Sequence, residues 1–150
     1  MKKVTTILIA LISLTATAQD LDMNEVDEFT GASKKVTKEY VCAEGVTKIA
    51  MRFGNIDGTH CIYTYPYKKL GCSGAVGNYL ILKFTDGTTI KLEDVSDIDC
   101  KDYATSIFIF QPELVKGKVI EKIRFKQSEY YDDGEWISEF NLADFVNAVK

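Results

Sequence analysis

Short segments of strand length, separated by regularly spaced turn residues, most limit the folds open to this chain of 150 residues. The turn signals lie at Gly31, at Glu44-Gly45, between Asn55 and Gly58, at Asp86-Gly87 and at Asp133-Gly134. Spacing of this kind is typical of all-β domains. The predicted strands cover residues 23–30, 35–42, 46–53, 59–65, 78–84, 88–93, 105–110, 119–126 and 135–140.

The hairpin that turns at Gly87 can be predicted down to its register. A two-residue turn would mix apolar and polar side chains on one face, whereas a three-residue loop pairs Leu82 with Ile90. The same loop pairs Leu80 with Leu92. Because a slip of one residue turns every side chain to the opposite face, the apolar pattern selects the three-residue loop. Gly87 then takes the left-handed position of a G1 bulge.

The remaining segments complete a predicted β architecture. Residues 107–110 are apolar on both faces, which predicts a central strand covered on both sides. Residues 111–117 read as one helical turn, opened by Pro112 and closed by Gly117. After Asn141, apolar residues recur at helical spacing up to Val149. We expect a mainly β fold, an antiparallel β-sandwich or curled sheet of about eight or nine strands, with a short C-terminal helix packed on it.

The first residues have the pattern of a signal peptide. A cationic start is followed by an uncharged apolar run, and Ala16-Thr17-Ala18 supplies small residues for a signal peptidase. The apolar run is about eleven residues long, and a bilayer span needs about 20. We therefore expect residues 1–18 to be removed near Ala18/Gln19. Residues 19–150 would form a single secreted or periplasmic β domain.

Charge and cysteine placement narrow the expected partners. After the leader the chain keeps 16 basic and 22 acidic residues, a net charge of −6. Nucleic acid and anionic lipid both require clustered cations, and Lys34-Lys35 and Lys68-Lys69 are isolated doublets. No second apolar stretch reaches spanning length, and the first cysteine, Cys42, lies too far from the leader for a lipoprotein anchor. We expect no nucleic acid, membrane span or lipid anchor.

Four cysteines remain after the leader: Cys42, Cys61, Cys72 and Cys100. An even number in an exported domain favours two disulfides, for which three connectivities are open. We favour pairing the two strand residues, Cys42 and Cys61, and the two loop residues, Cys72 and Cys100. The alternatives are free buried thiols and a four-thiolate zinc site, although the spacings of 19, 11 and 28 residues lack the usual paired knuckles.

A series of motifs in the C-terminal half resembles a loose group of small secreted bacterial β-domain proteins that have no known activity. The resemblance rests on LKFTDGTTIKL at residues 82–92, Cys100, PELV at 112–115 and IEKIRF at 120–125. These motifs consist of turn and core residues. The resemblance therefore implies a β fold and brings no site residues.

The sequence carries few candidate catalytic or metal-binding groups. His60 is the only histidine, and the nearby turn predicts a surface or half-buried place at a strand start. No nucleophile elbow, zinc-binding helix or phosphate loop is present in the sequence. The densest acidic run, Asp94 to Asp102, could supply oxygen ligands for calcium but lacks the EF-hand order, so solvated loop acids are the simpler interpretation. We predict no catalytic residue, metal or cofactor.

Aromatic residues are the candidate binding groups. Tyr63, Tyr65 and Tyr67 alternate and would share one strand face, either in the core or rim, which we favour, or exposed to stack on sugar rings. Pro66 suggests an edge strand or a strand end. Tyr131 and Trp136 flank an acidic turn, where they could pair across a hairpin or contact a partner.

These observations lead to three hypotheses about function. The first is an exported, non-enzymatic binding module for a glycan or protein at the cell envelope or outside the cell. The second is a secreted inhibitor of a hydrolase that uses the acidic turn before Trp136 as a plug. The third is a small hydrolase with paired carboxylates, which needs two acids in one cleft.

Overall fold

A computed structural model describes residues 21–41, 48–67, 71–127 and 134–137, together with Val146 and Val149. Within these residues the fold is mainly β and contains ten strands and one short 3₁₀ helix. The strands form two separate antiparallel sheets.

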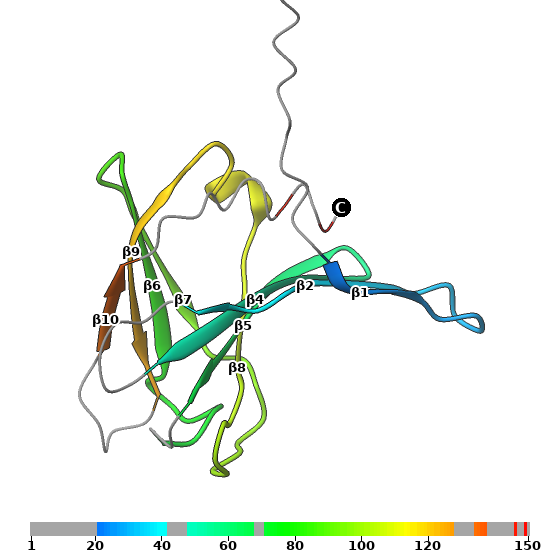
Figure 1. Cartoon of the computed structure of the whole chain (residues 1–150), viewed down its shortest axis with the longest axis horizontal. Helices are drawn as coiled ribbons and strands as arrows, with labels where there is room; N and C mark the ends of the chain where they lie inside the picture. The colour runs from blue at the N-terminus through cyan, green and yellow to red at the C-terminus, as the bar shows by residue number, and fades with distance from the viewer. Residues whose placement is uncertain are drawn as a thin grey trace, which may run out of the picture.

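The larger sheet has six strands and carries the N-terminal part of the chain. Its strands follow the order β1-β2-β4-β5-β8, and the short β3 also pairs with β4. In Figure 1 the β1–β2 hairpin extends away from the other strands. The bounds are β1 Leu21–Val26, β2 Ser33–Thr37, β3 Tyr40–Val41, β4 Ile49–Ile56, β5 Thr59–Pro66 and β8 Ser106–Ile109.

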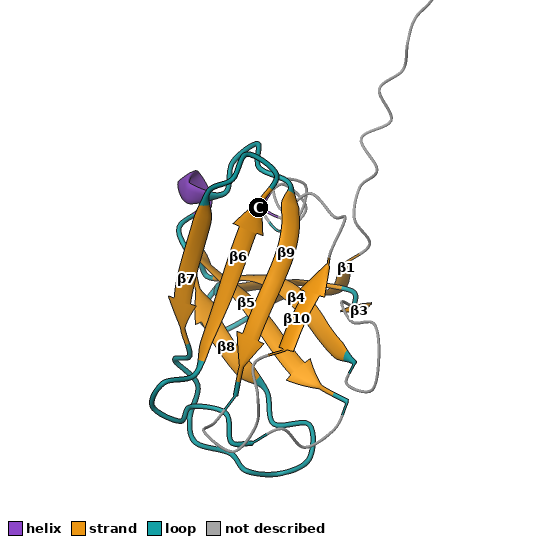
Figure 2. Cartoon of the chain, turned by 90° about the vertical axis from the view of Figure 1, so that its left-hand side faces the viewer, coloured by secondary structure: helices purple, strands orange, loops and turns teal. Residues whose placement is uncertain are grey.

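The smaller sheet has four strands in the order β10-β9-β6-β7, and Figure 2 shows it in front of the larger one. The single helical turn expected near Pro112 is present as η1, which begins at this proline. Gly117 follows with a φ of 71°, in the left-handed region that favours glycine. The bounds are β6 Tyr79–Phe84, β7 Thr89–Glu93, η1 Pro112–Leu114, β9 Ile120–Lys126 and β10 Gly134–Ile137.

One hydrophobic cluster contains side chains from both sheets. In β6 every second residue is buried, because successive side chains of a strand point to opposite faces. In β9 Ile123 and Phe125 follow the same alternation, and a register irregularity separates them from the buried Ile120. The same alternation in β4 and β5 leaves Arg52 and Tyr63 on the face opposite the core. The fully buried members from strands are Ile49, Met51, Phe53, Ile62, Leu80, Leu82, Phe84, Phe108, Ile120, Ile123 and Phe125.

The β6–β7 hairpin confirms the predicted register. Leu82 pairs with Ile90, and Leu80 pairs with Leu92. Gly87 has a φ of 84° and its amide donates to the carbonyl of Phe84 at 2.9 Å. The apolar pattern was sufficient here because the hairpin is local and one of its faces is buried.

The sequence predicted a central strand at residues 107–110 and a C-terminal helix that covers the sheet. The prediction of a central strand at 107–110 is wrong: β8 is an edge strand that pairs only with β5 among the described strands, and Ile109 is 51% exposed. An apolar run on both faces does not distinguish a central strand from an edge strand with an apolar outer face. The expected C-terminal helix lies outside the described residues except for Val146 and Val149, both of which are buried.

Candidate functional site

The tyrosines of β5 lie on the outer face of the six-stranded sheet. Ile62 and Thr64 are buried on the core side, and the alternate residues Tyr63 and Tyr65 are half-buried on the other side. Tyr67 follows immediately after the strand end at Pro66 and is 39% exposed. These three side chains therefore belong to the surface rather than to the core cluster.

A shallow pocket of about 240 Å³ is hollowed into this outer face. Arg52 pairs directly with Tyr63 across the β4–β5 ladder, so the two side chains stand beside each other. Strands β1 and β2 supply one wall of the pocket, and the residue before β8 supplies the opposite one. The lining residues are Met23, Lys34, Val36, Arg52, Tyr63, Tyr65 and Thr105.

Hydrogen bonds fix the polar groups of this surface. Arg52 Nε donates to the Tyr65 hydroxyl at 3.1 Å, and that hydroxyl donates to Glu39 Oε2 at 2.5 Å. The Tyr67 hydroxyl donates to the other oxygen of Glu39, Oε1. Arg52 Nη1 donates to Asp22 Oδ2 at 2.6 Å. We call the surface formed by these five residues and Tyr63 the tyrosine face.

Arg52, Tyr63 and Tyr65 keep fixed charge states near neutral pH. The pKa of Arg52 is raised by its hydrogen bond with Tyr65, so the guanidinium remains charged. Burial is the main cause that raises the pKa of Tyr65, and the hydrogen bond to Glu39 raises it further. Burial likewise raises the pKa of Tyr63. Both hydroxyls therefore remain protonated hydrogen-bonding groups.

Cys61 and His60 lack the features of catalytic groups. Cys61 is buried beneath the tyrosine face, and burial raises the pKa of its thiol, which keeps it in the unreactive protonated form. His60 lies near the start of β5, half-buried as expected, and contacts Phe110 edge-on with ring centroids 5.9 Å apart. Alternation places His60 on the core side of β5, opposite Cys61 and Tyr63.

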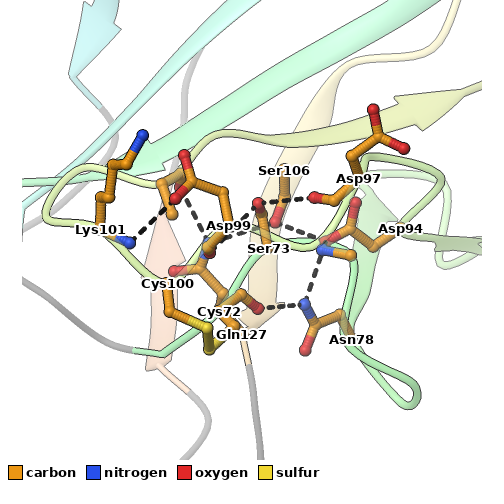
Figure 3. Close-up of a disulfide and its surroundings, with 12 residues drawn as sticks. Cys72, Ser73, Asn78, Asp94, Asp97, Asp99, Cys100, Lys101, Ser106 and Gln127 are labelled. Carbon is orange, nitrogen blue, oxygen red and sulfur yellow. Dashed lines mark hydrogen bonds between the residues drawn. A yellow bond between two sulfur atoms is a disulfide. The ribbon is translucent and has the colours of Figure 1, made fainter.

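A second polar cluster centres on Asp94, the residue directly after β7 (Figure 3). Its carboxylate accepts six hydrogen bonds. They come from the backbone amides of Gly74, Ser96 and Ile107 and from the side chains of Asn78, Ser96 and Ser106. Burial alone would raise the pKa of Asp94, but these hydrogen bonds outweigh it and the pKa is lowered. Asp94 thus ties the loop after Gly71 to the segment that leads into β8.

The Cys72–Cys100 disulfide joins the same two loops. The paired cysteines are 28 residues apart in sequence and flank an antiparallel bridge between Ser73 and Asp99. The second expected bridge is not formed, because Cys61 is a free thiol. Cys42, its expected partner, lies outside the described residues. The strand location of Cys61 was predicted correctly but does not imply a disulfide, because the side chain packs against Gly54 and Tyr63.

The acidic run is not a set of equivalent solvated acids. Asp94 points inward as a hydrogen-bond acceptor, whereas Asp97 and Asp102 are exposed. Among the residues that the structure describes, no three His, Cys, Asp or Glu side chains are grouped to hold a metal ion. The interpretation as solvated loop acids is therefore wrong for Asp94, because serine and asparagine donors surround its carboxylate.

Two candidate aromatic residues are not joined to the tyrosine face. Tyr131 lies outside the described residues. Trp136 belongs to β10, where its backbone pairs with Ile123 in the other sheet. The sequence reasoning missed Arg52, Glu39 and Asp22. Arg52 was detectable as the single charge within the apolar segment of β4, whereas Glu39 and Asp22 reach it only through the fold.

The chain matches no known protein family, no curated protein and no solved structure. The resemblance based on the C-terminal motifs consequently stays a prediction. Within the described part of the chain, no helix has the length and apolarity needed to cross a membrane.

Proposed function

We propose that this protein is an exported, non-enzymatic binding module that takes a glycan on its tyrosine face. The observation that carries the proposal is the open pocket in which Arg52 stands opposite Tyr63 and is hydrogen-bonded to Tyr65. Sugar rings present apolar C–H faces to aromatic rings and hydroxyls to charged or amide groups, and this surface offers both. Its volume lies just below the range of about 300–1,000 Å³ for small-molecule sites, which suits a short sugar segment.

Preorganisation supports the same proposal. The Tyr65 hydroxyl is held by a donor on one side and an acceptor on the other, so the ring is fixed before any ligand arrives. Fixed binding groups lower the entropy cost of association. For the fold, we propose the finer description of a β-sandwich, because side chains from both sheets share one core.

The hydrolase alternative fits this surface less well. Glu39 and Asp22 are carboxylates in contact with the pocket groups, and both serve as hydrogen-bond acceptors for Arg52 or the tyrosines. A glycosidase needs one carboxyl group aimed at the glycosidic oxygen as a proton donor. The inhibitor hypothesis depends on the acidic turn before Trp136, which lies outside the described residues.

Export is part of the proposal and has its own test. Cleavage near Ala18/Gln19 would release the β domain into the periplasm or the medium. N-terminal sequencing of the protein recovered from those fractions should begin at Gln19. Recovery of the intact Met1 N-terminus from the cytoplasmic fraction would contradict export.

A glycan array tests the binding function. The purified domain, residues 19–150, should bind a defined subset of glycans, and Tyr63→Ala should reduce that binding at least tenfold. Tyr65→Phe should weaken it less, because the ring remains and only the hydroxyl links are lost. Phe29→Ala is the matched control, since Phe29 is a 98% exposed aromatic residue in the β1–β2 turn. Absence of binding to any glycan, or equal losses in Tyr63→Ala and Phe29→Ala, would contradict the proposal.

A further inference from the structure

The outer face of the four-stranded sheet carries a cluster of basic residues that the linear sequence does not reveal. Strand register places Lys83 of β6 opposite Lys122 of β9. In the next row, Ile81 of β6 lies between Lys91 of β7 and Arg124 of β9. We call this surface the basic face; its cations are Lys83, Lys91, Lys122, Arg124 and Lys126.

The orientation of this face follows from the burial of the intervening residues. Leu80 and Leu82 of β6 and Phe125 of β9 are fully buried in the shared core. Their alternate neighbours must therefore point away from the core, and Lys91 and Arg124 are exposed. In Figure 2 the face is turned to the viewer, and no described segment crosses in front of β6, β7 and β9.

The face is hollowed at its centre and positively charged overall. A groove of about 280 Å³ is lined by Ile81, Lys83, Thr89, Lys122 and Arg124. Glu121 forms an ion pair with Lys83 at 3.4 Å. By strand register, Glu93 is paired with Tyr79 and the backbone of Glu135 is paired with Arg124. The five cations still outnumber these three acids, in a chain whose net charge is −4.

We propose that the basic face binds an anionic polysaccharide, at a site separate from the tyrosine face. Neighbouring strands are about 4.8 Å apart and alternate residues of one strand about 6.8 Å apart, so the two rows form a band of cations across the sheet. A linear polymer with repeated carboxylates or sulfates can follow such a band. Charge complementarity would steer and orient the polymer.

Two other polyanions fit the face less well. Insertion into an anionic membrane uses exposed apolar side chains, and none of the large exposed hydrophobic residues in the described part of the chain lies on β6, β7 or β9. Single-stranded nucleic acid is bound by stacking its bases on open aromatic rings. Tyr79 is the aromatic residue on the outer face of β6, and the Lys91 ammonium lies over its ring at 4.9 Å.

The test uses residues 19–150 and four immobilised or suspended probes. Polygalacturonate and heparin should retain the protein at low salt and release it as the salt concentration rises, since exposed charge pairs are screened. The double variant Lys91→Gln/Arg124→Gln should lose at least tenfold in affinity for both polymers. Lys101→Gln/Lys116→Gln is the matched control, because it removes two exposed cations elsewhere and should change affinity less than twofold.

Several outcomes would overturn the assignment. These are no retention on either polymer at low salt, equal losses in the two double variants, or tighter binding to phosphatidylglycerol vesicles or DNA than to the polysaccharides. The proposal is independent of the tyrosine face. Tyr63→Ala should leave polyanion binding unchanged, and Lys91→Gln/Arg124→Gln should leave binding to the neutral glycans of the array unchanged.

Discussion

The ring of Tyr63 lies against Gly54 on the neighbouring strand. A β-carbon built on Gly54 would come within 2.9 Å of Tyr63 Cε2 and 3.2 Å of Cys61 Sγ. Glycine is unfavourable within strands, and here its missing side chain leaves room for the ring. The position of Tyr63 on the tyrosine face thus depends on a glycine one strand away.

We therefore predict that Gly54→Ala displaces the Tyr63 ring. It should lower the free energy of unfolding by about 1–3 kcal/mol, the usual cost of overpacking, and should also weaken glycan binding. In a Tyr63→Ala background the same substitution should cost less, because the closest contact is gone. Urea denaturation of the four proteins of this double-mutant cycle measures the coupling. Equal costs in both backgrounds would show that the ring does not occupy this space.

The disulfide arrangement gives a second prediction. Cys72→Ser/Cys100→Ser should lower the free energy of unfolding by about 3 kcal/mol, because it frees a loop of intermediate length in the unfolded chain. Alkylation of the non-reduced protein in denaturant, followed by peptide mapping, should label Cys61 and leave Cys72 and Cys100 unlabelled. An unlabelled Cys61 would mean that it is bridged, as the placement of Cys42 and Cys61 on predicted strands favours.

Because of Asp94, the free energy of unfolding should depend on pH in the acidic range. Its pKa is lower in the folded protein than in the unfolded chain, so its contribution is fully present above the unfolded value of about 3.9. The contribution is lost as the pH falls through the lower, folded-state pKa. Asp94→Asn should cost about 2 kcal/mol at pH 7, because charged hydrogen bonds to Ser106, Ser96 and Gly74 are lost.

Urea denaturation at a series of pH values checks the Asp94 prediction. The difference between the wild type and Asp94→Asn should shrink as the pH falls below about 4. Asp102→Asn provides the control, since Asp102 is an exposed acid in the same run and its loss should have little effect. A difference that stays constant down to pH 2 would contradict the role of the Asp94 charge.

Arg52→Lys should separate binding from stability. Lysine keeps the positive charge but cannot reproduce the planar set of contacts to Tyr65 and Asp22. The ion pair with Asp22 is partly exposed, so the loss in the free energy of unfolding should be about 1 kcal/mol or less. Glycan affinity should fall at least fivefold on titration calorimetry. Unchanged affinity would remove Arg52 from the proposed site.

Local patterns made part of this structure predictable. The β6–β7 register followed from apolar alternation beside one turn, because pairing of adjacent strands requires only local information. Alternation similarly placed Tyr63 and Tyr65 on one face of β5. Whether that face points to the core or to solvent could not be predicted. The alternate residues Ile62 and Thr64 are one apolar and one polar, so their pattern does not identify the core side.

Contacts between distant segments were not predictable in the same way. Lys83, Lys91 and Arg124 are separated in sequence, and only the β6–β7 and β6–β9 registers bring them onto one face. The role of Asp94 depends on donors from two loops that a disulfide holds together. The isolated lysine doublets of the sequence therefore gave no sign of the basic face. The acidic run from Asp94 to Asp102 likewise did not show that Asp94 is a half-buried hydrogen-bond acceptor.

The tyrosine face can be tested most directly by locating a bound glycan. Uniformly ¹⁵N-labelled protein, residues 19–150, would be titrated with the neutral oligosaccharide that binds most strongly on the array, and amide shifts followed by NMR. The largest shifts should occur at Arg52, Gly54, Tyr63 and Tyr65, and they should be absent in Tyr63→Ala. Shifts confined to β6, β7 and β9, or to the loops around the Cys72–Cys100 disulfide, would contradict a binding site on the tyrosine face.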